Sequence, residues 1–468
     1  MLHGRVIVLD IGKTVAKLSL WDEEGRLVAR RQRRNARGAG AGRMWLDAGG
    51  IEQWASVVFG EFARLGPVVA IVPVAHGAAV AVVRGGQLAA PVVDYEEPIP
   101  ADLRNEYLAQ RDPFPLTGSP ALPDGLNLGA QLHRIDREQP DLLTGDACLV
   151  PWPQYWAWRL CGVAASEVTS LGCHSDLWWP EARVPSALAH SHGWAARLAP
   201  LRRADSVLGT LSTEWAMKTG LARSVRIYCG LHDSNAALWA IRARPEVIGR
   251  ELTVLTTGTW FVAMRLPAIG VTSKLAALPE SRDCLVNVDV DGREVPSARY
   301  MGGRELEILG GLARCDPQDA VRAIATQLHT GNMVLPSWIT AVGPYPRAAG
   351  KWVGEPRDPA ARVALLALYA ALMVDASLEL IGTEERLVVE GRFASDTLFT
   401  RTLAALRPQM QVLVDSGDDD GVARGALRLV ESSLPVQGAL RRVVPLACDL
   451  AAYKRRWRTA IGAEEYAA

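Results

Sequence analysis

The chain has 468 residues, of which 49% are hydrophobic and 22% charged, an ordinary composition for a globular protein. Its length predicts two domains, each large enough to bury a core of its own. Lys and Arg total 51, as do Asp and Glu, so the formal net charge is zero. Because proteins that bind nucleic acid or anionic membranes usually carry a basic surplus, we expect neither partner.

No targeting segment is expected either. The first residues run directly into an apolar segment at 6–10, which leaves no room for a signal peptide. Pro, Gly or charged residues interrupt the apolar stretches before they reach the ~18–20 residues of a membrane span. The seven cysteines are scattered and include no Cys-x-x-Cys pair: Cys148, Cys161, Cys173, Cys229, Cys284, Cys315 and Cys448. We interpret them as buried apolar thiols in a reducing compartment, the cytoplasm, rather than as disulfides or a zinc site.

The chain begins with a predicted β-meander. Residues 6–10 are almost all apolar, as in a central strand, whereas residues 15–21 alternate between apolar and polar side chains. A further short strand is predicted at 27–28. The turn between the first two strands consists of Gly12, Lys13 and Thr14.

A second unit of the same form is predicted at residues 253–264, where Gly258 and Thr259 form the turn. Two such units, about half the chain apart, indicate a domain duplication. Between them the sequence predicts a hairpin at 80–93 and helices at 126–138 and 152–160. After them it predicts a hairpin around 291–292, strands at 387–390 and 411–414, a loop at 417–421, and helices at 359–381, 396–406 and 422–431. Strands mixed with crossover helices predict an α/β architecture, with a domain boundary near 242–249.

The first turn combines an acid, a glycine, a cation and a hydroxyl. A Walker A loop is excluded because it requires Gly five residues before Gly12, where residue 7 is Ile. The backbone N–H groups of a tight turn can nevertheless hold phosphate oxygens, and Asp10 could hold Mg²⁺ directly or through water. The alternative is an ordinary hairpin, in which Asp and Gly are common.

A second acid, Asp233, stands between a predicted strand at 225–229 and an Ala-rich helix. An Asp near a helix N-terminus is stabilised as the anion, which suits a base that deprotonates a hydroxyl. The alternative is a simple helix N-cap.

Three segments, in chain order, are similar to motifs of one known family. Asp10-Ile-Gly-Lys-Thr14 is similar to the first phosphate-binding turn of the FGGY carbohydrate kinases, usually Asp-x-Gly-Thr-Thr. Gly230-Leu-His-Asp233 is similar to their Gly-Gly-His-Asp element, whose Asp is the catalytic base. Thr256-Thr-Gly-Thr-Trp260 is similar to their second phosphate turn, especially in rhamnulokinases. From Val6 to about Val430 the sequence thus resembles this family, within the superfamily of actin and the sugar kinases.

Two segments of the second half resemble the family's adenosine site. Glu390-Gly-Arg-Phe393 is similar to a Gly-Gly-Gly-Ser-Arg-Asn element, although one glycine stands where three are usual. The predicted helix with Gly421 and Gly425 stands where the family has Ala-x-Gly-Ala-Ala. The resemblance therefore implies that Gly391, Gly421 and Gly425 lie at the nucleotide.

A hairpin of the first half resembles the family's sugar-contacting strand pair, which usually reads Gln-x-x-Gly, a turn and Trp-x-Asp-x-Arg. His76, Asp94 and Glu96 stand at its polar positions, so the resemblance implies that they bind sugar hydroxyls. A lone His before Gly is otherwise more often structural. Glu96 replaces the usual Arg, which affects the identity of the sugar more than the reaction. Lys13 replaces a small residue of the first turn and could either add charge near the phosphates or extend into solvent.

The resemblance implies an α/β fold with two actin-like (ribonuclease H-like) ATPase domains that flank a catalytic cleft. Residues 1–244 would carry the sugar site and the base Asp233, and residues 245–468 the adenosine site. ATP and Mg²⁺ are the implied cofactors, with Asp10 at the metal. The implied cofactor-binding residues are Gly12, Lys13, Thr14, Thr257, Gly258, Thr259, Gly391, Gly421 and Gly425.

The implied function is ATP-dependent phosphorylation of a sugar hydroxyl, with a ketose such as L-rhamnulose or L-fuculose, or a related polyol, as the acceptor. The partners would be this small sugar and ATP; a homodimer is allowed, and the sequence leaves the oligomeric state open. The alternative is a regulator on the same fold that binds nucleotide or sugar without catalysis, although the retained acids and phosphate turns count against it. An NAD-dependent enzyme is excluded, because no strand precedes a Gly-x-Gly-x-x-Gly and the glycines at 38–42 fall in an Arg-rich loop.

Overall fold

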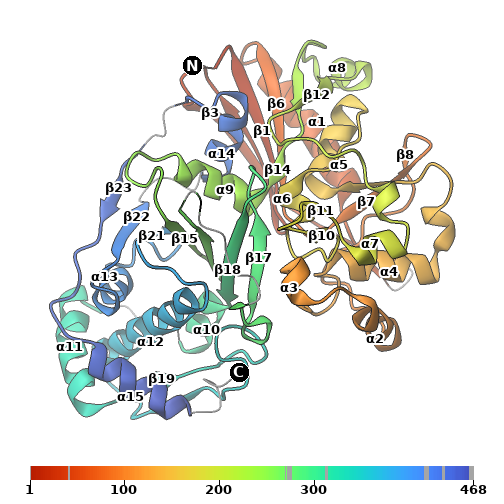
Figure 1. Cartoon of the computed structure of the whole chain (residues 1–468). Coiled ribbons are helices and arrows are strands. Elements are labelled where there is room, and N and C mark those ends of the chain that lie inside the picture. The colour runs from red at the N-terminus through yellow and green to blue at the C-terminus, as the bar shows by residue number, and fades with distance from the viewer. Residues whose placement is uncertain are drawn as a thin grey trace. The chain divides into compact units, whose positions relative to one another are not determined.

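The computed structural model describes residues 2–40, 43–268, 270, 277–310, 315–415, 421–434 and 438–462, in two compact units (Figure 1). Unit 1 comprises Met1–Ala243, Val286–Glu294 and Asp420–Val436. Unit 2 comprises Arg244–Leu285, Val295–Asp419 and Gln437–Ala468. The first unit is therefore built from three segments of the chain, whereas the sequence analysis divided the chain at one point, after residue 244.

A mixed seven-stranded sheet forms the centre of unit 1. Its main path is β12-β13-β6-β1-β2-β3, and β14 also pairs with β6. The strands are β1 (Arg5–Ile11), β2 (Val15–Trp21), β3 (Leu27–Arg34), β6 (Val68–Ala75), β12 (Val207–Thr210), β13 (Arg226–Tyr228) and β14 (Leu231–His232). The first three form the predicted antiparallel meander, and β1 runs parallel to β6.

Helices pack against both faces of this sheet: α1 (Ala48–Ala63), α5 (Trp152–Cys161), α9 (Asp233–Arg242) and α14 (Gly421–Val430). Alternate side chains of β1 belong to different cores, because successive residues of a strand point to opposite faces. Ile7 and Leu9 pack in the core with α1 and α5, whereas Val6 and Val8 pack in the core with α9 and α14. None of these four side chains is more than 1% exposed, which confirms the prediction of a central strand.

Smaller elements complete unit 1. They are β4 (Arg37–Gly40), β5 (Arg43–Leu46), β7 (Val80–Arg84), β8 (Gln87–Leu88), α2 (Ala101–Gln110), α3 (Phe114–Thr117), α4 (Leu128–Glu138), β9 (Cys148–Pro151), α6 (Val168–Leu171), β10 (Trp178–Trp179), β11 (Val184–Pro185), α7 (Ala187–Ser191) and α8 (Thr213–Thr219). The predicted hairpin at 80–93 and the helices at 126–138 and 152–160 are confirmed. The prediction of a loop at 38–42 was wrong for its described part, because β4 pairs with β5 as an antiparallel ribbon.

Unit 2 repeats the strand order of unit 1. The sheet that contains most of its strands runs β17-β18-β16-β15-β21-β22-β23, and residues 286–288 of β17 are counted with unit 1. The strands are β15 (Leu252–Thr257), β16 (Phe261–Leu266), β17 (Cys284–Val288), β18 (Glu294–Tyr300), β21 (Arg386–Gly391), β22 (Gln411–Asp415) and β23 (Leu440–Arg442). In both units a three-stranded antiparallel meander is followed by two parallel strands and one antiparallel strand. This shared topology supports the predicted domain duplication.

The longest helix of unit 2, α12 (Pro359–Leu380), is apolar enough to cross a membrane by length and composition, and no other described helix is. However, 89% of its most apolar window is buried inside the protein, as in the core helix of a globular domain. The remaining elements of unit 2 are α10 (Gly302–Ile308), α11 (Pro317–Thr330), β19 (Met333–Leu335), β20 (Lys351–Val353), α13 (Thr397–Leu406) and α15 (Ala451–Ile461). The predicted helices at 359–381, 396–406 and 422–431 are confirmed, whereas residues 417–420 of the predicted loop lie outside the described residues.

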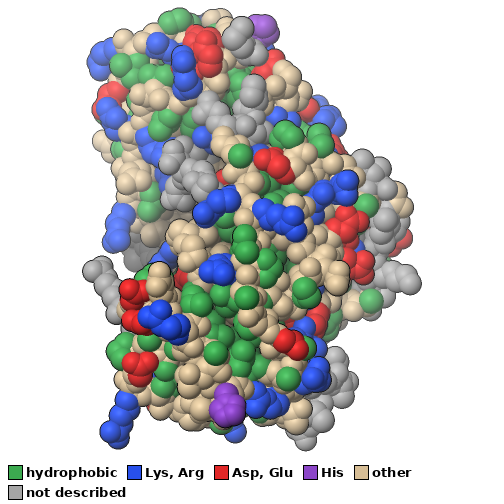
Figure 2. Space-filling view, turned by 90° about the vertical axis from the view of Figure 1, so that its left-hand side faces the viewer, with side chains coloured by type: hydrophobic (Ala, Val, Ile, Leu, Met, Phe, Trp, Pro, Cys, Tyr) green, Lys and Arg blue, Asp and Glu red, His purple; other side chains and the backbone are tan. Residues whose placement is uncertain are grey.

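Charged side chains of both signs are interspersed on the face of the protein drawn in Figure 2. This distribution agrees with the formal net charge of zero.

The contact between α14 and α9 depends on a glycine. A Cβ atom on Gly425 would lie 1.8 Å from the carbonyl oxygen of Ala236, a backbone atom that cannot turn aside. The absent side chain allows the two helices to approach closely. This packing alone accounts for a glycine at position 425, which the sequence analysis had assigned to the nucleotide.

Gly425→Ala is therefore expected to lower the free energy of unfolding by ~1–3 kcal/mol, the usual effect of overpacking. Gly49→Ala is the matched control, because Gly49 is exposed on α1 and an added Cβ would meet nothing within 4 Å. Alanine is favoured over glycine in a helix, so the control should be as stable as the wild type or slightly more stable. Thermal melts measure both variants, and equal melting temperatures would contradict the packing role.

Candidate active site

The first turn lies at the carboxyl end of β1, where Asp10 is half-buried. The Gly12 amide donates a hydrogen bond to the Val15 carbonyl at 3.1 Å, and the Asn35 side chain donates one to the Gly12 carbonyl at 2.8 Å. Within the described residues, the amides of Lys13 and Thr14 have no backbone partner. With the exposed hydroxyl of Thr14, these two N–H groups can bind an anion.

The ammonium group of Lys13 forms an ion pair with the Asp94 carboxylate, 81 residues away in the chain. It also lies 4.4 Å from the ring centroid of Tyr95. The side chain of Lys13 is 14% exposed and that of Asp94 is 1% exposed. Of the two possibilities that the sequence left open for Lys13, the structure excludes extension into solvent.

A small pocket lies beside this turn, and its lining includes Lys13, His76, Asp94 and Trp152. His76 Nδ1 donates a hydrogen bond to the Gly77 carbonyl at 2.7 Å, and burial lowers the pKa of His76. A neutral imidazole with its proton on Nδ1 keeps Nε2 as an acceptor.

The Asp94 carboxylate has one occupied and one free oxygen. Oδ1 accepts hydrogen bonds from Lys13 and, at 2.9 Å, from the Glu96 amide. Oδ2 is buried and has no partner among the described residues. Because buried polar atoms are normally paired, this oxygen indicates a place for a hydrogen-bond donor of a ligand.

Glu96 does not line this pocket, although the sequence analysis grouped it with His76 and Asp94. What it contributes is its backbone amide, which fixes the Asp94 carboxylate. The structure thus brings two of the three predicted sugar ligands together and leaves the third side chain outside.

Asp233 is the first residue of α9, and the N-cap position before it belongs to His232. The alternative of a simple N-cap is therefore excluded. The Asp233 carboxylate accepts a hydrogen bond from the Ser234 amide at 2.6 Å and lies 3.2 Å from His232 Nε2. Gly230 allows this placement: its φ is 75°, and a Cβ atom there would lie 1.9 Å from the Pro73 carbonyl oxygen.

Asp10 and Asp233 influence each other electrostatically. Burial and then the negative charge of Asp233 raise the pKa of Asp10 to about 7, and the cations Lys17 and Arg30 oppose this shift. The described residues include no cluster of three or more side chains that could hold a metal alone. Mg²⁺ is commonly bound by one or two carboxylates together with substrate phosphates. The carboxylate oxygens of Asp10 are donors of the kind that this ion prefers.

The second turn belongs to unit 2, between β15 and β16. The Gly258 amide donates a hydrogen bond to the Trp260 carbonyl at 2.9 Å, and Thr259 is exposed. Thr257 is buried, and its hydroxyl donates to the Glu390 carbonyl at 2.6 Å and accepts from the Phe393 amide at 2.9 Å. The Thr257 hydroxyl therefore links β15 to the end of β21. The groups of this turn that can contact a ligand are its backbone and the Thr259 side chain.

Gly391 adjoins this second turn. Its φ is 82°, and a Cβ atom would lie 2.4 Å from the Thr257 carbonyl oxygen. The sequence analysis missed Gly303 of α10, where a Cβ atom would lie 2.0 Å from the Gly258 carbonyl oxygen. The Gly-Gly pair that begins that helix was the available signal. Of the two glycines assigned to the nucleotide in α14, Gly421 begins the helix and Gly425 packs on α9, both within unit 1.

The sequence analysis also missed Cys173, whose Sγ lies 3.6 Å from His232 Nε2. All seven thiols are free. The interpretation of all seven as buried apolar thiols was wrong in two respects, because Cys173 contacts a histidine and four others are only half-buried. Those four are Cys148, Cys161, Cys315 and Cys448. A separation of 59 residues gave no local signal for the contact.

Comparisons with known proteins identify relatives of the chain in sequence and in fold. Residues 249–437 match the carbohydrate kinase FGGY C-terminal domain. The L-fuculokinase of Salmonella typhi is 25% identical over 292 residues, which are 60% of this chain and only 60% of that enzyme. The crystal structure of a carbohydrate kinase from Novosphingobium aromaticivorans has 48% identity and a TM-score of 0.92, over 97% of this chain and 100% of that one. A xylulose kinase from Rhodospirillum rubrum has 18% identity and a TM-score of 0.78, over 99% of both chains. These likenesses confirm the predicted α/β fold with two actin-like domains.

Proposed function

Because the chain belongs to the FGGY family of carbohydrate kinases, we propose that it transfers the γ-phosphoryl group of ATP to a hydroxyl group of a sugar. The observation that carries this proposal is the placement of Asp233. Its carboxylate is held at the start of α9 by the Ser234 amide and is only partly buried, with 27% of the side chain exposed. A fixed, accessible carboxylate can accept the proton of a bound hydroxyl.

The reaction requires positioning and charge neutralisation more than covalent chemistry from the protein. As Asp233 takes the proton, the hydroxyl oxygen attacks the γ-phosphorus and ADP leaves. The free amides of Lys13 and Thr14 would bind phosphate oxygens, and Asp10 would hold Mg²⁺. When bound, Mg²⁺ neutralises charge on the transferred phosphoryl group. In unit 2, Gly258, Thr259 and Gly391 are the proposed nucleotide contacts.

We propose a ketose of the L-fuculose or L-rhamnulose class, or a related polyol, as the acceptor. The pocket beside the first turn offers acceptor atoms, namely His76 Nε2 and Asp94 Oδ2, to hydroxyl donors. The similarity to an L-fuculokinase supports the same class. ATP supply and seven free thiols fit a reaction in the cytoplasm.

A coupled assay of ADP release tests the proposal, with ATP, Mg²⁺ and a panel of ketoses and polyols. We expect release that depends on a sugar and is fastest with L-fuculose or L-rhamnulose, over a control without sugar. ATP binding without sugar-dependent ADP release across the panel would overturn it, and would favour a binding regulator.

A test of the metal role is Asp10→Asn, which we expect to raise the Mg²⁺ concentration for half-maximal kcat by ~10-fold or more. Because the pKa of Asp10 is raised to about 7 in the folded protein, its ionisation weakens folding; the cost grows as the pH rises above the unfolded-state value of ~4 and is complete above about 7. Without Mg²⁺, the variant should therefore melt above the wild type at neutral and alkaline pH and close to it only below pH ~4. Mg²⁺ should stabilise the wild type more than the variant.

Titrations of kcat with Mg²⁺ and thermal melts with and without Mg²⁺ measure these effects. Asp22→Asn is the matched control, because Asp22 follows the opposite end of the same hairpin and pairs with Arg26 at 2.8 Å. An unchanged Mg²⁺ dependence in Asp10→Asn would contradict the assignment.

A further inference from the structure

A buried cysteine and a buried histidine meet directly beside the proposed base. Cys173 Sγ lies 3.6 Å from His232 Nε2, and the same nitrogen lies 3.2 Å from Asp233 Oδ1. Cys173 is 3% exposed and His232 is 6% exposed. One ring nitrogen therefore faces both a thiol and the carboxylate.

The groups around the ring can accept hydrogen bonds from both nitrogens of an imidazolium when the Asn235 amide is turned over. Both nitrogens of an imidazolium are donors, so each needs an acceptor. Nε2 has the carboxylate and the sulfur, and Nδ1 lies 3.4 Å from the side-chain nitrogen Nδ2 of Asn235, which is a donor in this orientation of the amide. The amide oxygen of Asn235 is buried and has no partner among the described residues. A half-turn of this amide places the oxygen at Nδ1 and pairs it.

The surrounding charges favour a thiolate and an imidazolium over a neutral pair. Although burial opposes it, His174 and His232 lower the pKa of Cys173. Although burial again opposes it, Cys173 and then Asp233 raise the pKa of His232. The titratable groups that face this pair are Glu167, His174, Asp233 and His76.

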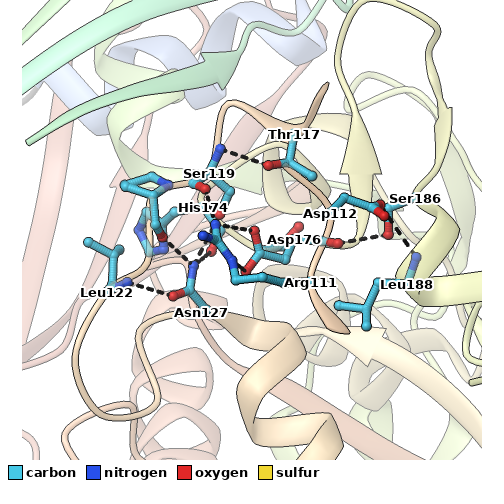
Figure 3. A network of polar contacts seen from close by, with 12 residues as sticks. Arg111, Asp112, Thr117, Ser119, Leu122, Asn127, His174, Asp176, Ser186 and Leu188 are labelled. Atoms are coloured by element: carbon cyan, nitrogen blue, oxygen red, sulfur yellow. Dashed lines mark hydrogen bonds and ion pairs between the residues drawn. The ribbon is translucent and has the colours of Figure 1, made fainter. Parts of the chain in front are cut away.

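The loop that carries Cys173 is strained and firmly braced. His174 and Asp176 have φ values of 38° and 61°, in the left-handed region that L-residues rarely adopt. The Asn127 side chain donates to the His174 carbonyl at 3.0 Å, and Arg111 donates to the Asp176 carboxylate at 3.0 Å (Figure 3). Such strain persists only where the surroundings over-determine it, and it is concentrated at functional sites.

His232 is fixed by its backbone as well. Its amide donates to the Thr169 hydroxyl oxygen at 3.0 Å, and Glu167 accepts from the Thr169 amide at 2.9 Å. At Gly77, a Cβ atom would lie 3.0 Å from Cys173 Sγ and 3.1 Å from His232 Nε2. The missing side chain thus leaves room for the contact, directly after the sugar-pocket residue His76.

We propose that Cys173 is a positioning residue for phosphoryl transfer, whose thiolate keeps His232 protonated so that the imidazolium orients the Asp233 carboxylate. The proposal rests on the proposed function for its effect on catalysis, but the ion pair itself can be observed without activity. The sulfur touches neither sugar nor phosphate in this role. It acts through His232 on the orientation of the carboxylate.

The first test counts thiolates in the intact wild-type protein by their ultraviolet absorbance during an acid titration. Burial raises the pKa of all six other cysteines, so at neutral pH only Cys173 should be ionised. We expect one thiolate per chain, lost in Cys173→Ala and kept in Cys284→Ala, the matched control for loss of a buried thiol. No thiolate in the wild type at neutral pH would overturn the proposal, whether or not the protein is a kinase.

The second test compares Cys173→Ala and Cys173→Ser in the ADP-release assay. Both should lower kcat by up to ~10²-fold, the scale of a misplaced catalytic group, with little change in the KM for the sugar. Because Cys173 raises the pKa of His232, its removal lets His232 lose its proton at lower pH, so the alkaline fall of kcat should move towards neutral pH. A purely structural role would be rescued by Ser, and rescue with an unchanged pH profile would overturn the proposal.

Discussion

Asp233→Asn is expected to lower kcat by ~10²–10⁴, the usual contribution of a positioned general base, while the KM for the sugar changes little. The amide has almost the same size as the carboxylate, and its oxygen can still accept the hydrogen bond that the Ser234 amide makes at 2.6 Å. What it cannot do is take a proton from a hydroxyl. Steady-state kinetics with saturating ATP and Mg²⁺ measure both constants.

A suitable control is Asp136→Asn, because Asp136 also lies beside a histidine, 3.0 Å from His192 Nδ1, but does not line the pocket proposed for the sugar. This variant should keep the wild-type kcat. If Asp233→Asn retained more than about a tenth of the wild-type kcat, Asp233 would not be the general base.

The strands and helices were predictable because their signals are local. The apolar run of β1 and the alternation in β2 depend on residues within one element, and both were predicted within two residues of their observed ends. The unit to which an element belongs is not a local property. Helix α14 was predicted correctly as a helix, yet it packs in unit 1 because Gly425 fits the backbone of Ala236.

The same limit applies to the candidate site. Motifs located Asp10, Asp233 and Asp94. Of these carboxylates, Asp94 has a buried oxygen, Oδ2, that has no hydrogen-bond partner among the described residues. The partners of these side chains were not predictable, because Lys13 meets Asp94 across 81 residues and Cys173 meets His232 across 59. The roles of the threonine hydroxyls were also ambiguous. Thr257 and Thr259 lie at one turn, but of these two only Thr257 has a hydrogen-bond partner for its hydroxyl among the described residues.

Asp94→Asn is expected to raise the KM for the sugar by ~10–10²-fold, the value of a hydrogen bond to a charged group. The amide can keep the hydrogen bond from the Glu96 amide, but it loses the charge that pairs with Lys13 and the buried acceptor Oδ2. The KM for ATP should stay within a few-fold, and kcat should fall less than in Asp233→Asn. Kinetics in each substrate measure the difference.

Asp94→Asn also breaks the ion pair and leaves the Lys13 ammonium almost buried without a partner. Breaking a fully buried ion pair lowers the free energy of unfolding by ~3–5 kcal/mol. The loss is smaller here because the Lys13 side chain is 14% exposed. Glu97→Gln is the matched control. Glu97 is 5% exposed, lies in the same loop and pairs with Arg134 at 3.1 Å, but does not line the sugar pocket. It should lower the melting temperature and leave the KM for the sugar unchanged.

The double variant Lys13→Met with Asp94→Asn distinguishes a role of Asp94 in binding the sugar from a role in stabilising its loop. Removing both charges leaves no unpaired ammonium, so the melting temperature should recover much of what Asp94→Asn loses. If Asp94 binds a sugar hydroxyl through Oδ2, the KM for the sugar stays raised in the double variant. If the carboxylate only braces the loop, the KM recovers together with the melting temperature, and His76 and Asp94 must be withdrawn from the sugar site.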